Sequence, residues 1–393
     1  MRIQILGIRS KNTGADRFRR DPKMKTRTAI VIWIIALILT LNPGTIHLVS
    51  GADTNEVVLA RIGQIETADA YDLWVDPNND IAYVTCGYSG VIVLDVSEPH
   101  NPTELALMPS SSNGYAHQFV MRENLMFIGD GNGGLKIIDW ANLSNPNLLS
   151  QYTGEYSWDV EVEGNTAFVA NGFMGSGDRL TIVNITDPTN PMLLGSHTTV
   201  GDATDIEVAE NLAFVTTSYA GITVFDVSNR TNPVQVGQYT GQSTSNAELG
   251  DLEIVDNLAY LSYWEKGLKV LNISDISSIE LVAEFNESLN AFSVHIERDS
   301  SLGFLCDHEL GLVVLDISIP TQPNEIGQYF DGGKPNRIQV VDNLVYMTDS
   351  DNGFVILEII ENHTFISGFE LVLIVGSIVS ILAVGWWLRK RKS

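Results

Sequence analysis

The stretch Val91-Ile92-Val93-Leu94-Asp95 decides the fold, because related segments recur six more times along the chain. The other copies are Leu135-Lys136-Ile137-Ile138-Asp139, Leu180-Thr181-Ile182-Val183-Asn184, Ile222-Thr223-Val224-Phe225-Asp226, Leu268-Lys269-Val270-Leu271-Asn272, Leu312-Val313-Val314-Leu315-Asp316 and Phe354-Val355-Ile356-Leu357-Glu358. Their last positions lie 42 to 46 residues apart, and a glycine directly precedes six of the seven copies. Such a period is found in propeller blades and in helical solenoids, so the pattern inside one repeat has to distinguish them.

Each repeat contains four short segments with the pattern of β-strands, as the fourth copy illustrates. We expect strands at residues 205–209, 212–216, 222–227 and 234–239, the first alternating in polarity and the second nearly continuously apolar. In five copies an Asn-Pro or Gln-Pro pair precedes the fourth strand. This fits a strand at the outer edge of the blade, where the missing N–H of proline removes no hydrogen bond between strands. A helical solenoid would show 3.6-residue spacing instead. The sequence therefore predicts an all-β, seven-bladed β-propeller of four-stranded blades.

The seventh copy lacks a fourth strand of its own, because the chain continues from it toward the C-terminal apolar segment. Residues 57–64, which precede the first copy, resemble the fourth strands of the other repeats. We expect this N-terminal strand to complete the last blade and so to remove the open edges of the ring. The propeller then covers residues 54–360, with no second globular domain.

The repeated core, followed by Ser and an Asn-Pro pair, resembles the LVIVD repeat family of propeller proteins. The third copy departs from the pattern by an insertion at residues 173–179, and the fifth lacks the Asn-Pro pair. The resemblance covers about three quarters of the chain. It implies a surface or exported β-propeller, and it implies no shared reaction.

The N-terminal region, residues 1–51, has the parts of a secretory signal. Lys25 and Arg27 precede thirteen residues, 29–41, that are apolar except for Thr40, and small residues follow at 50–52. Thirteen helical residues are too short to cross a bilayer. We expect a signal peptide, with Met24 as an alternative true start, and an uncleaved N-terminal anchor is the other interpretation.

The C-terminal region predicts a membrane anchor. Residues 361–370 form a stalk, Leu371 to Leu388 carry no charge over eighteen residues, and residues 389–393 form a basic tail. Such a run is typical of a transmembrane helix with a basic cytoplasmic stop, which would place the propeller outside the cell. The preceding Ser367-Gly368-Phe369-Glu370 resembles the Pro-Gly-Phe type of archaeal C-terminal surface anchor, with serine in place of proline.

The charge of the 393-residue chain divides along the same lines. Its net charge of -25 conceals a body, residues 52–388, with ten basic and 46 acidic side chains. This excludes a typical nucleic-acid binder, which carries a basic patch. The two cysteines, Cys86 and Cys306, are too few for a disulfide scaffold, and they fall in blades that are not neighbours. We expect two buried thiols.

Two columns of polar residues are predicted on the face where the inner strands begin, opposite the membrane anchor. The first column rings the mouth of the central channel and holds Asp72, Gln118, Asp159, Asp205, Asp251, Ser293 and Arg337, with His117 beside it. The second lies in the turns between strands two and three and includes Asp130, Asn171, Asp307 and Asp349, with Asp351 nearby. Because crowded carboxylates raise one another's pKa unless a cation relieves them, this face is a candidate binding surface for Ca²⁺ or a basic ligand.

A structural interpretation competes with each of these sites. A repeated aspartate commonly bonds backbone within its own blade or caps a turn. The turn at residues 349–353 superficially resembles a Ca²⁺ loop, but the sixth position of the loop is Phe354 and the twelfth is Ile360. Asp130, Asp349 and Asp351 are therefore only weak metal candidates. His117 and His295 lack a diagnostic partner for catalysis, and a buried histidine is the competing interpretation. Several aromatic residues are expected near the same face, where there are two interpretations of their role: they stack on a ligand, or they fill the core between blades. These residues are Tyr71, Tyr115, Trp158, Tyr219, Trp264 and Phe292.

Several sequons lie in connections between predicted strands. Asn142, Asn229 and Asn286 are in such connections and Asn362 is in the stalk, so they are candidate glycosylation sites.

No nucleophile elbow, phosphate loop or dinucleotide fingerprint is present. We expect a cell-surface-anchored, non-catalytic binding module for protein or glycan that uses its acidic outward face and requires no cofactor. A hydrolase or lyase at the channel mouth and a structural surface-layer component are the alternatives.

Overall fold

The computed structural model describes residues 57–361, except 111–113, 174–175, 219–220, 241–248, 288–289 and 299. These residues form seven antiparallel sheets of four strands each. The first three sheets are β2 (Leu73–Asp76), β3 (Ile81–Thr85), β4 (Val91–Asp95) and β5 (Thr103–Met108); β6 (Phe119–Arg122), β7 (Leu125–Gly129), β8 (Leu135–Asp139) and β9 (Asn147–Tyr152); and β10 (Ser157–Glu163), β11 (Thr166–Phe173), β12 (Ser176–Asn184) and β13 (Met192–Thr198).

The fourth to sixth sheets follow the same order. They are β14 (Ala203–Ala209), β15 (Leu212–Thr217), β16 (Gly221–Asp226) and β17 (Val234–Tyr239); β18 (Leu249–Val255), β19 (Leu258–Tyr263), β20 (Gly267–Asn272) and β21 (Glu280–Phe285); and β22 (Ala291–Glu297), β23 (Leu302–Asp307), β24 (Gly311–Asp316) and β25 (Asn324–Tyr329). Two short 3-10 helices, η1 (Trp264–Lys266) and η2 (Ile276–Ser278), lie in the fifth repeat. The four strands expected in the fourth copy are confirmed within two residues at every end.

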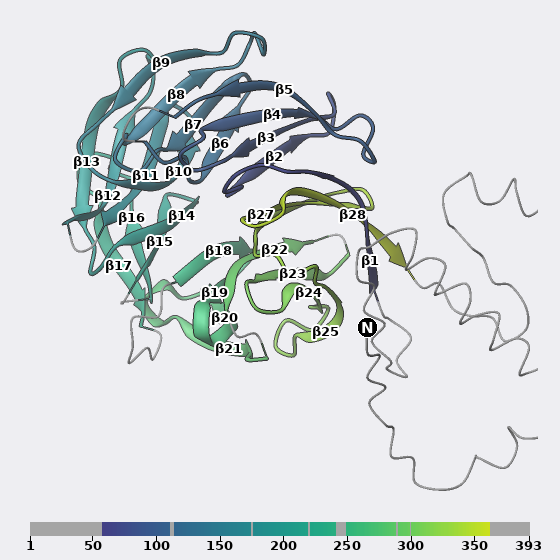
Figure 1. Cartoon of the computed structure of the whole chain (residues 1–393). Helices are drawn as coiled ribbons and strands as arrows, with labels where there is room; N and C mark the ends of the chain where they lie inside the picture. The colour runs from purple at the N-terminus through teal and green to yellow at the C-terminus, as the bar shows by residue number, and fades with distance from the viewer. Residues whose placement is uncertain are drawn as a thin grey trace, which may run out of the picture.

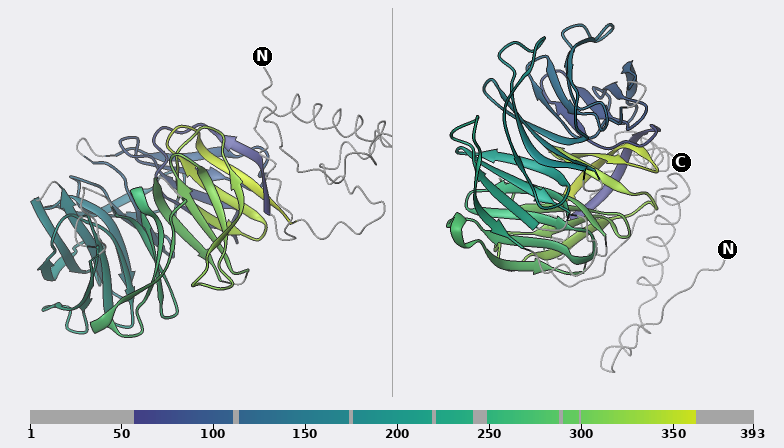
Figure 2. Two further views of the ribbon diagram at one scale, coloured as in Figure 1. Left: turned by 90° about the horizontal axis from the view of Figure 1, so that it is seen from below. Right: turned by 90° about the vertical axis from the view of Figure 1, so that its left-hand side faces the viewer.

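The seventh sheet closes the ring with the N-terminal strand, as the sequence predicts. It consists of β26 (Pro335–Val341), β27 (Leu344–Asp349), β28 (Gly353–Glu361) and β1 (Val57–Ile65), in the order β1-β28-β27-β26. β1 pairs antiparallel with β28, so that Val57 lies opposite Glu361. Figures 1 and 2 show the purple β1 beside the yellow β28. The two ends of the described chain therefore leave the propeller together, at the Glu361 end of β28.

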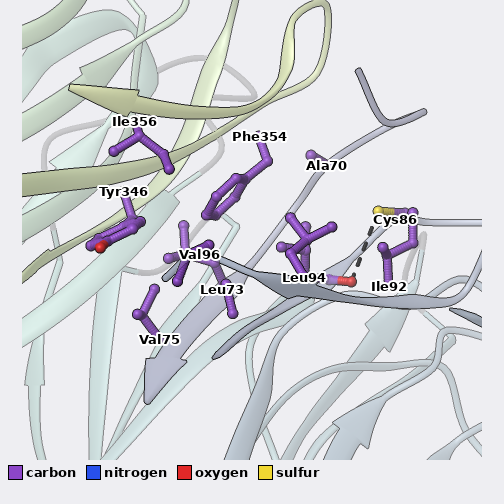
Figure 3. Packing of buried hydrophobic residues seen from close by; sticks show 12 residues of the cluster. Ala70, Leu73, Val75, Cys86, Ile92, Leu94, Val96, Tyr346, Phe354 and Ile356 are labelled. Carbon is purple, nitrogen blue, oxygen red and sulfur yellow. Dashed lines mark hydrogen bonds between the residues drawn. The ribbon is translucent and has the colours of Figure 1, made fainter. Parts of the chain in front are cut away.

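The hydrophobic core is divided among the contacts between neighbouring blades. The described residues form seven hydrophobic clusters, and each draws its members from two adjacent sheets. Figure 3 shows the cluster at the closure, where Leu73, Val75 and Leu94 of the first blade pack against Phe354 and Ile356 of the seventh. The third strands are covered on both faces, and in the first, sixth and seventh blades their apolar runs are accordingly continuous rather than alternating. The other four have Lys or Thr at the second position of the core.

The repeated polar and glycine positions fix the turns at both ends of the third strand. Gly90, which opens the third strand of the first blade, has φ of 100°, and a Cβ there would lie 2.1 Å from the carbonyl oxygen of Met108. Only glycine suits such a position. At the other end, Asp226 Oδ1 accepts a hydrogen bond of 2.9 Å from the amide of Ser228. The repeated aspartate is thus an Asx turn that directs the chain into the fourth strand.

The predicted signal region, stalk, membrane segment and basic tail lie outside the described residues. Within residues 57–361, apart from the gaps given above, no helix is long and apolar enough to span a bilayer. Cys86 and Cys306 are both buried free thiols, which confirms that expectation. Burial raises the pKa of each thiol to about 12.

Leu59 tests whether β1 is an integral part of the last blade. Its side chain is 5% exposed and packs with Phe304 and Tyr329, so Leu59→Ala should cost about 2–5 kcal/mol of unfolding free energy. Leu107, on the equivalent strand of the first blade, is 48% exposed, and Leu107→Ala should cost much less. Denaturant unfolding of both variants measures the difference. Equal costs would contradict the closure by β1.

Candidate functional site

The predicted first column lies at the start of the seven inner strands and surrounds one end of the channel. Asp72, Asp159, Asp205 and Asp251 are all at most 7% exposed, and so is Ser293. Arg337 is 28% exposed at its side chain and belongs to the same ring. Four carboxyl groups therefore share a buried site with one guanidinium, and such a site needs hydrogen bonds or shared protons to be stable.

The second carboxyl oxygen of each aspartate accepts a hydrogen bond from the backbone of the following blade. Asp72 Oδ2 accepts from the amide of Phe119 at 3.0 Å, and Asp159 Oδ2 accepts from that of Ile206 at 2.9 Å. Asp205 and Asp251 repeat the contact with the amides of Leu252 (3.0 Å) and Val294 (3.2 Å). The sequence suggested bonds within one blade, and Asp72 and Asp159 do make such bonds through Oδ1, to the amides of Leu73 (2.9 Å) and Val160 (2.7 Å). The bonds through Oδ2, which the sequence did not suggest, join consecutive blades.

Hydroxyl groups at the ends of the second strands make a complementary link. Thr85 Oγ1 donates to the carbonyl oxygen of His117 at 2.6 Å, and Ser262 Oγ donates to that of Phe292 at 2.9 Å. Thr348 Oγ1 donates to the carbonyl oxygen of Tyr71 at 3.0 Å, across the closure of the ring. The starts of the second and sixth inner strands are therefore held through both an amide and a carbonyl group, and those of the first, fourth and fifth through one of the two. Together these bonds make the channel mouth a rigid frame.

Two longer side chains reach beyond the neighbouring blade, Arg337 to Asp251 of the fifth blade and Gln118 of the second blade to Asp205 of the fourth. Arg337 Nε lies 3.3 Å from Asp72 Oδ1, and its Nη1 forms an ion pair with Asp251 Oδ1. Gln118 Nε2 donates to Asp205 Oδ1 at 2.8 Å. The guanidinium thus neutralises part of the charge of the carboxylate ring, and the amide stabilises Asp205 by donating a hydrogen bond.

Burial and mutual repulsion keep this ring short of full ionisation. Burial raises the pKa of Asp72 to about 6 despite the nearby Arg337. Burial also raises the pKa of Asp205 well above its ordinary range, and the charges of Asp251 and Asp159 add to the effect. The expected crowding is therefore present, and it favours a bound cation or proton at the channel mouth.

A second ring of carboxylates lies one step further along the inner strands, and the sequence analysis missed it. Glu207 Oε2 accepts from the amide of Ile254 at 2.7 Å, and Glu253 Oε2 accepts from that of Ile296 at 2.9 Å. Burial raises the pKa of Glu161 to about 7 and that of Glu207 to about 8. Each of these residues follows a first-column position by two, so the alternation of a strand would have revealed the ring.

A cavity of about 320 Å³ lies over the channel mouth. It is lined by Tyr71, Gln118, Trp158, Asp202, Thr204, Ser218, Gly250, Asp251, Trp264, Phe292, Ser293, His308, Asn336, Arg337 and Ser350. Four of the predicted site residues are thus in its wall, namely Gln118, Asp251, Ser293 and Arg337. Asp72, Asp159 and Asp205 are absent from the wall and complete the ring around it. The volume is at the lower end of the range for small-molecule sites.

Aromatic rings from separate repeats form much of this wall. Phe292 is the centre of one group: its ring centroid lies 5.7 Å from Tyr71, 6.2 Å from Trp264 and 4.7 Å from His308. Trp158, on the third blade, donates its indole N–H to the carbonyl oxygen of Gly172 at 2.6 Å. The sequence placed these aromatic residues near the face but did not indicate that they share one cavity.

His117 does not reach the cavity. It is 2% exposed, its Nε2 lies 2.8 Å from the hydroxyl oxygen of Tyr156, and burial lowers its pKa to about 3. The Tyr115 ring packs against it at 4.6 Å between centroids. His295 lies in the second ring, where its Nδ1 is 3.3 Å from Glu253 Oε2. Tyr219 falls outside the described residues.

The second predicted column stabilises turns. Asp349 Oδ1 accepts from the amides of Asp351 (2.8 Å) and Asn352 (2.7 Å), and Asp307 Oδ1 binds its own turn in the same way. Asp130 forms a buried ion pair with Lys136. In the part of the chain that the structure describes, no group of three or more His, Cys, Asp or Glu side chains is arranged to hold a metal ion. The Ca²⁺ site therefore stays a prediction.

The three sequons in connections are accessible, since Asn142, Asn229 and Asn286 are all exposed. Asn362 lies outside the described residues. Glycosylation at these sites stays a prediction.

Glu207 predicts an unusual pH dependence of stability. Because its pKa is raised from 4.5 to about 8 on folding, its contribution to stability is fully present below pH 4.5 and is lost as the pH rises through 8. Glu207→Gln keeps an acceptor for the amide of Ile254 and removes the charge. The variant should melt about 2 °C or more above the wild type at pH 8, and at pH 4 the two proteins should have the same melting temperature.

Thermal unfolding monitored by circular dichroism at the two pH values checks this. The matched control is Glu104→Gln on the exposed outer strand β5, which should leave the melting temperature unchanged at both. A Glu207→Gln variant that is less stable than the wild type at pH 8 would contradict the raised pKa.

Comparisons with known proteins agree with this architecture. The model of the LVIVD repeat family matches residues 68–108, 113–154, 154–199, 200–241, 249–287, 304–331 and 332–364. Among solved structures, the chain is similar to the crystal structure of the computationally designed Ika8 protein, with a TM-score of 0.56 and 14% identity over 81% of this chain and 97% of that one. That similarity concerns the fold alone, and no curated protein shows significant similarity. Since the family model matches most of its length, the chain belongs to the LVIVD repeat family.

Proposed function

We propose that this protein is a non-catalytic binding module that takes its ligand into the cavity over the channel mouth. The observation that carries the proposal is the cavity itself, about 320 Å³ in volume and lined by Tyr71, Trp158, Trp264 and Phe292. A concave wall that combines aromatic rings with convergent polar groups is the usual form of a ligand site. The rigid frame of hydrogen bonds between blades supports it, because a preformed site loses little entropy on binding.

The position of the cavity suits an anchored receptor. Val57 and Glu361 pair at one end of β28, whereas Gly353, at its other end, pairs with Asp349 in a turn on the same face as the inner strand starts. An anchor at residues 371–388 would therefore hold the propeller by the face opposite the cavity. We place the propeller outside the cell, where a protein segment or a glycan has access to the cavity.

Filling the cavity tests this function. Ser350 lies in its wall, so Ser350→Trp should block it, whereas Ser318 is exposed at the opposite end of the third strand of the sixth blade. The full-length wild type, Ser350→Trp and Ser318→Trp chains are applied to arrays of cell-surface glycans and peptides. We expect ligands that the wild type and Ser318→Trp retain and that Ser350→Trp loses, by at least about tenfold in affinity. Ligands retained equally by all three chains would contradict a site in the cavity.

A further inference from the structure

Negatively charged side chains outnumber positively charged ones around the cavity. Asp202 and Asp251 line it, and Arg337 is the one guanidinium in its wall. Two more carboxylates contact lining residues from outside the wall, namely Asp72 with Arg337 and Asp205 with Gln118. Asp251 is 4% exposed, its Oδ2 accepts a hydrogen bond from the amide of Val294, and its Oδ1 forms an ion pair with Arg337. No further group among the described residues bonds to Oδ1, and a carboxylate oxygen can accept more than one hydrogen bond, so this buried oxygen in the cavity wall has room for a ligand group.

The other polar groups of the wall are largely engaged with one another. Asn336 Nδ2 donates to the carbonyl oxygen of Ala70 at 2.6 Å and to Ser350 Oγ at 2.7 Å, and its Oδ1 lies 3.1 Å from His308 Nε2. Ser218 Oγ donates to the carbonyl oxygen of Asp202 at 3.2 Å. A ligand with many hydroxyl groups would have to displace these bonds, so the wall is poorly suited to a hydrogen-bonding array.

The wall instead presents aromatic rings from four blades above a negative base. Tyr71 precedes the first inner strand, Trp158 lies on the third, Trp264 is in η1 of the fifth repeat and Phe292 is on the sixth inner strand. Ring faces carry a negative quadrupole that attracts cations, and alkylated ammonium groups also gain from contact with apolar surface. A simple metal ion would use carboxylate oxygens and gain nothing from the rings.

We infer that the ligand of this cavity carries an alkylated ammonium group, which the rings of Tyr71, Trp158, Trp264 and Phe292 enclose over the carboxylate of Asp251. The inference rests on the proposed function and specifies its ligand class. The ion pair with Arg337 holds Asp251 in place, and the ammonium group adds a second positive charge beside it.

Choline and its neutral isostere 3,3-dimethylbutan-1-ol test the ligand class, because they differ in charge and hardly in shape. Titration calorimetry with the full-length chain should give at least about tenfold tighter binding of choline. Asp251→Asn keeps an acceptor for the amide of Val294 but removes the charge, so it should abolish most of this preference. Trp264→Leu should weaken choline binding, whereas Tyr88→Leu, at a residue 75% exposed outside the cavity wall, should leave it unchanged.

Each contrary outcome has a distinct meaning. Equal affinity for the two probes, or choline binding that neither Asp251→Asn nor Trp264→Leu weakens, would overturn the ammonium site. If choline does not bind, the ligand class is also overturned. In that case the proposed function still stands if Ser350→Trp blocks a ligand found on the arrays, and it fails as well if Ser350→Trp blocks none. Melting curves of Asp251→Asn and Trp264→Leu show whether each variant is folded at the titration temperature.

Discussion

A hydrogen bond from the backbone of one blade to the aspartate of the preceding blade organises much of the channel mouth. Asp72, Asp159, Asp205 and Asp251 each make this bond, so the inner strand starts have fixed spacing between blades one and two and from blade three through blade six. The apolar clusters between blades supply most of the burial, but they do not fix the orientation of one blade relative to the next. The aspartate bonds fix this orientation, because a carboxylate accepts a hydrogen bond from an amide only at a defined distance and angle.

This frame has an electrostatic cost, which is the repulsion between its buried carboxylates. Holding carboxylates around a narrow channel brings like charges together, and burial deprives them of water. Arg337, Gln118 and the raised pKa of Asp205 each reduce that cost in a different way. The second ring at Glu161 and Glu207 continues the same arrangement into the channel. The result is a rigid, electronegative channel mouth beside the aromatic rings of the cavity, and this combination is the basis of the ammonium ligand proposed above.

The repeat made the fold predictable and the site only partly so. A sequence that returns to the same core every 42 to 46 residues indicates the strands, the number of blades and the closure by residues 57–64, because each copy confirms the others. The aspartate column was also visible. Its partners were not, since the bond crosses from one repeat to the next and a single copy contains only the acceptor.

The cavity was harder to predict than the aspartate column. Tyr71, Trp158 and Phe292 each directly precede a first-column residue, so the repeat register aligns them, whereas Trp264 lies in the turn before the third strand of the fifth repeat. Only the closed ring shows that these four rings line one cavity. Arg337 is likewise a single departure from the repeated pattern, and its contacts with Asp72 and Asp251 depend on the curvature of the ring.

Amide hydrogen exchange of the full chain is the most direct test of the bonds between blades. The amides of Phe119, Ile206, Leu252 and Val294 should exchange at least about a hundredfold more slowly than those of Ser97 and Ser228, which bond to aspartates in exposed turns. Slow exchange of all four would show that the inner strands open only when the propeller opens. Exchange as fast as in the turns would contradict the frame on which the site depends.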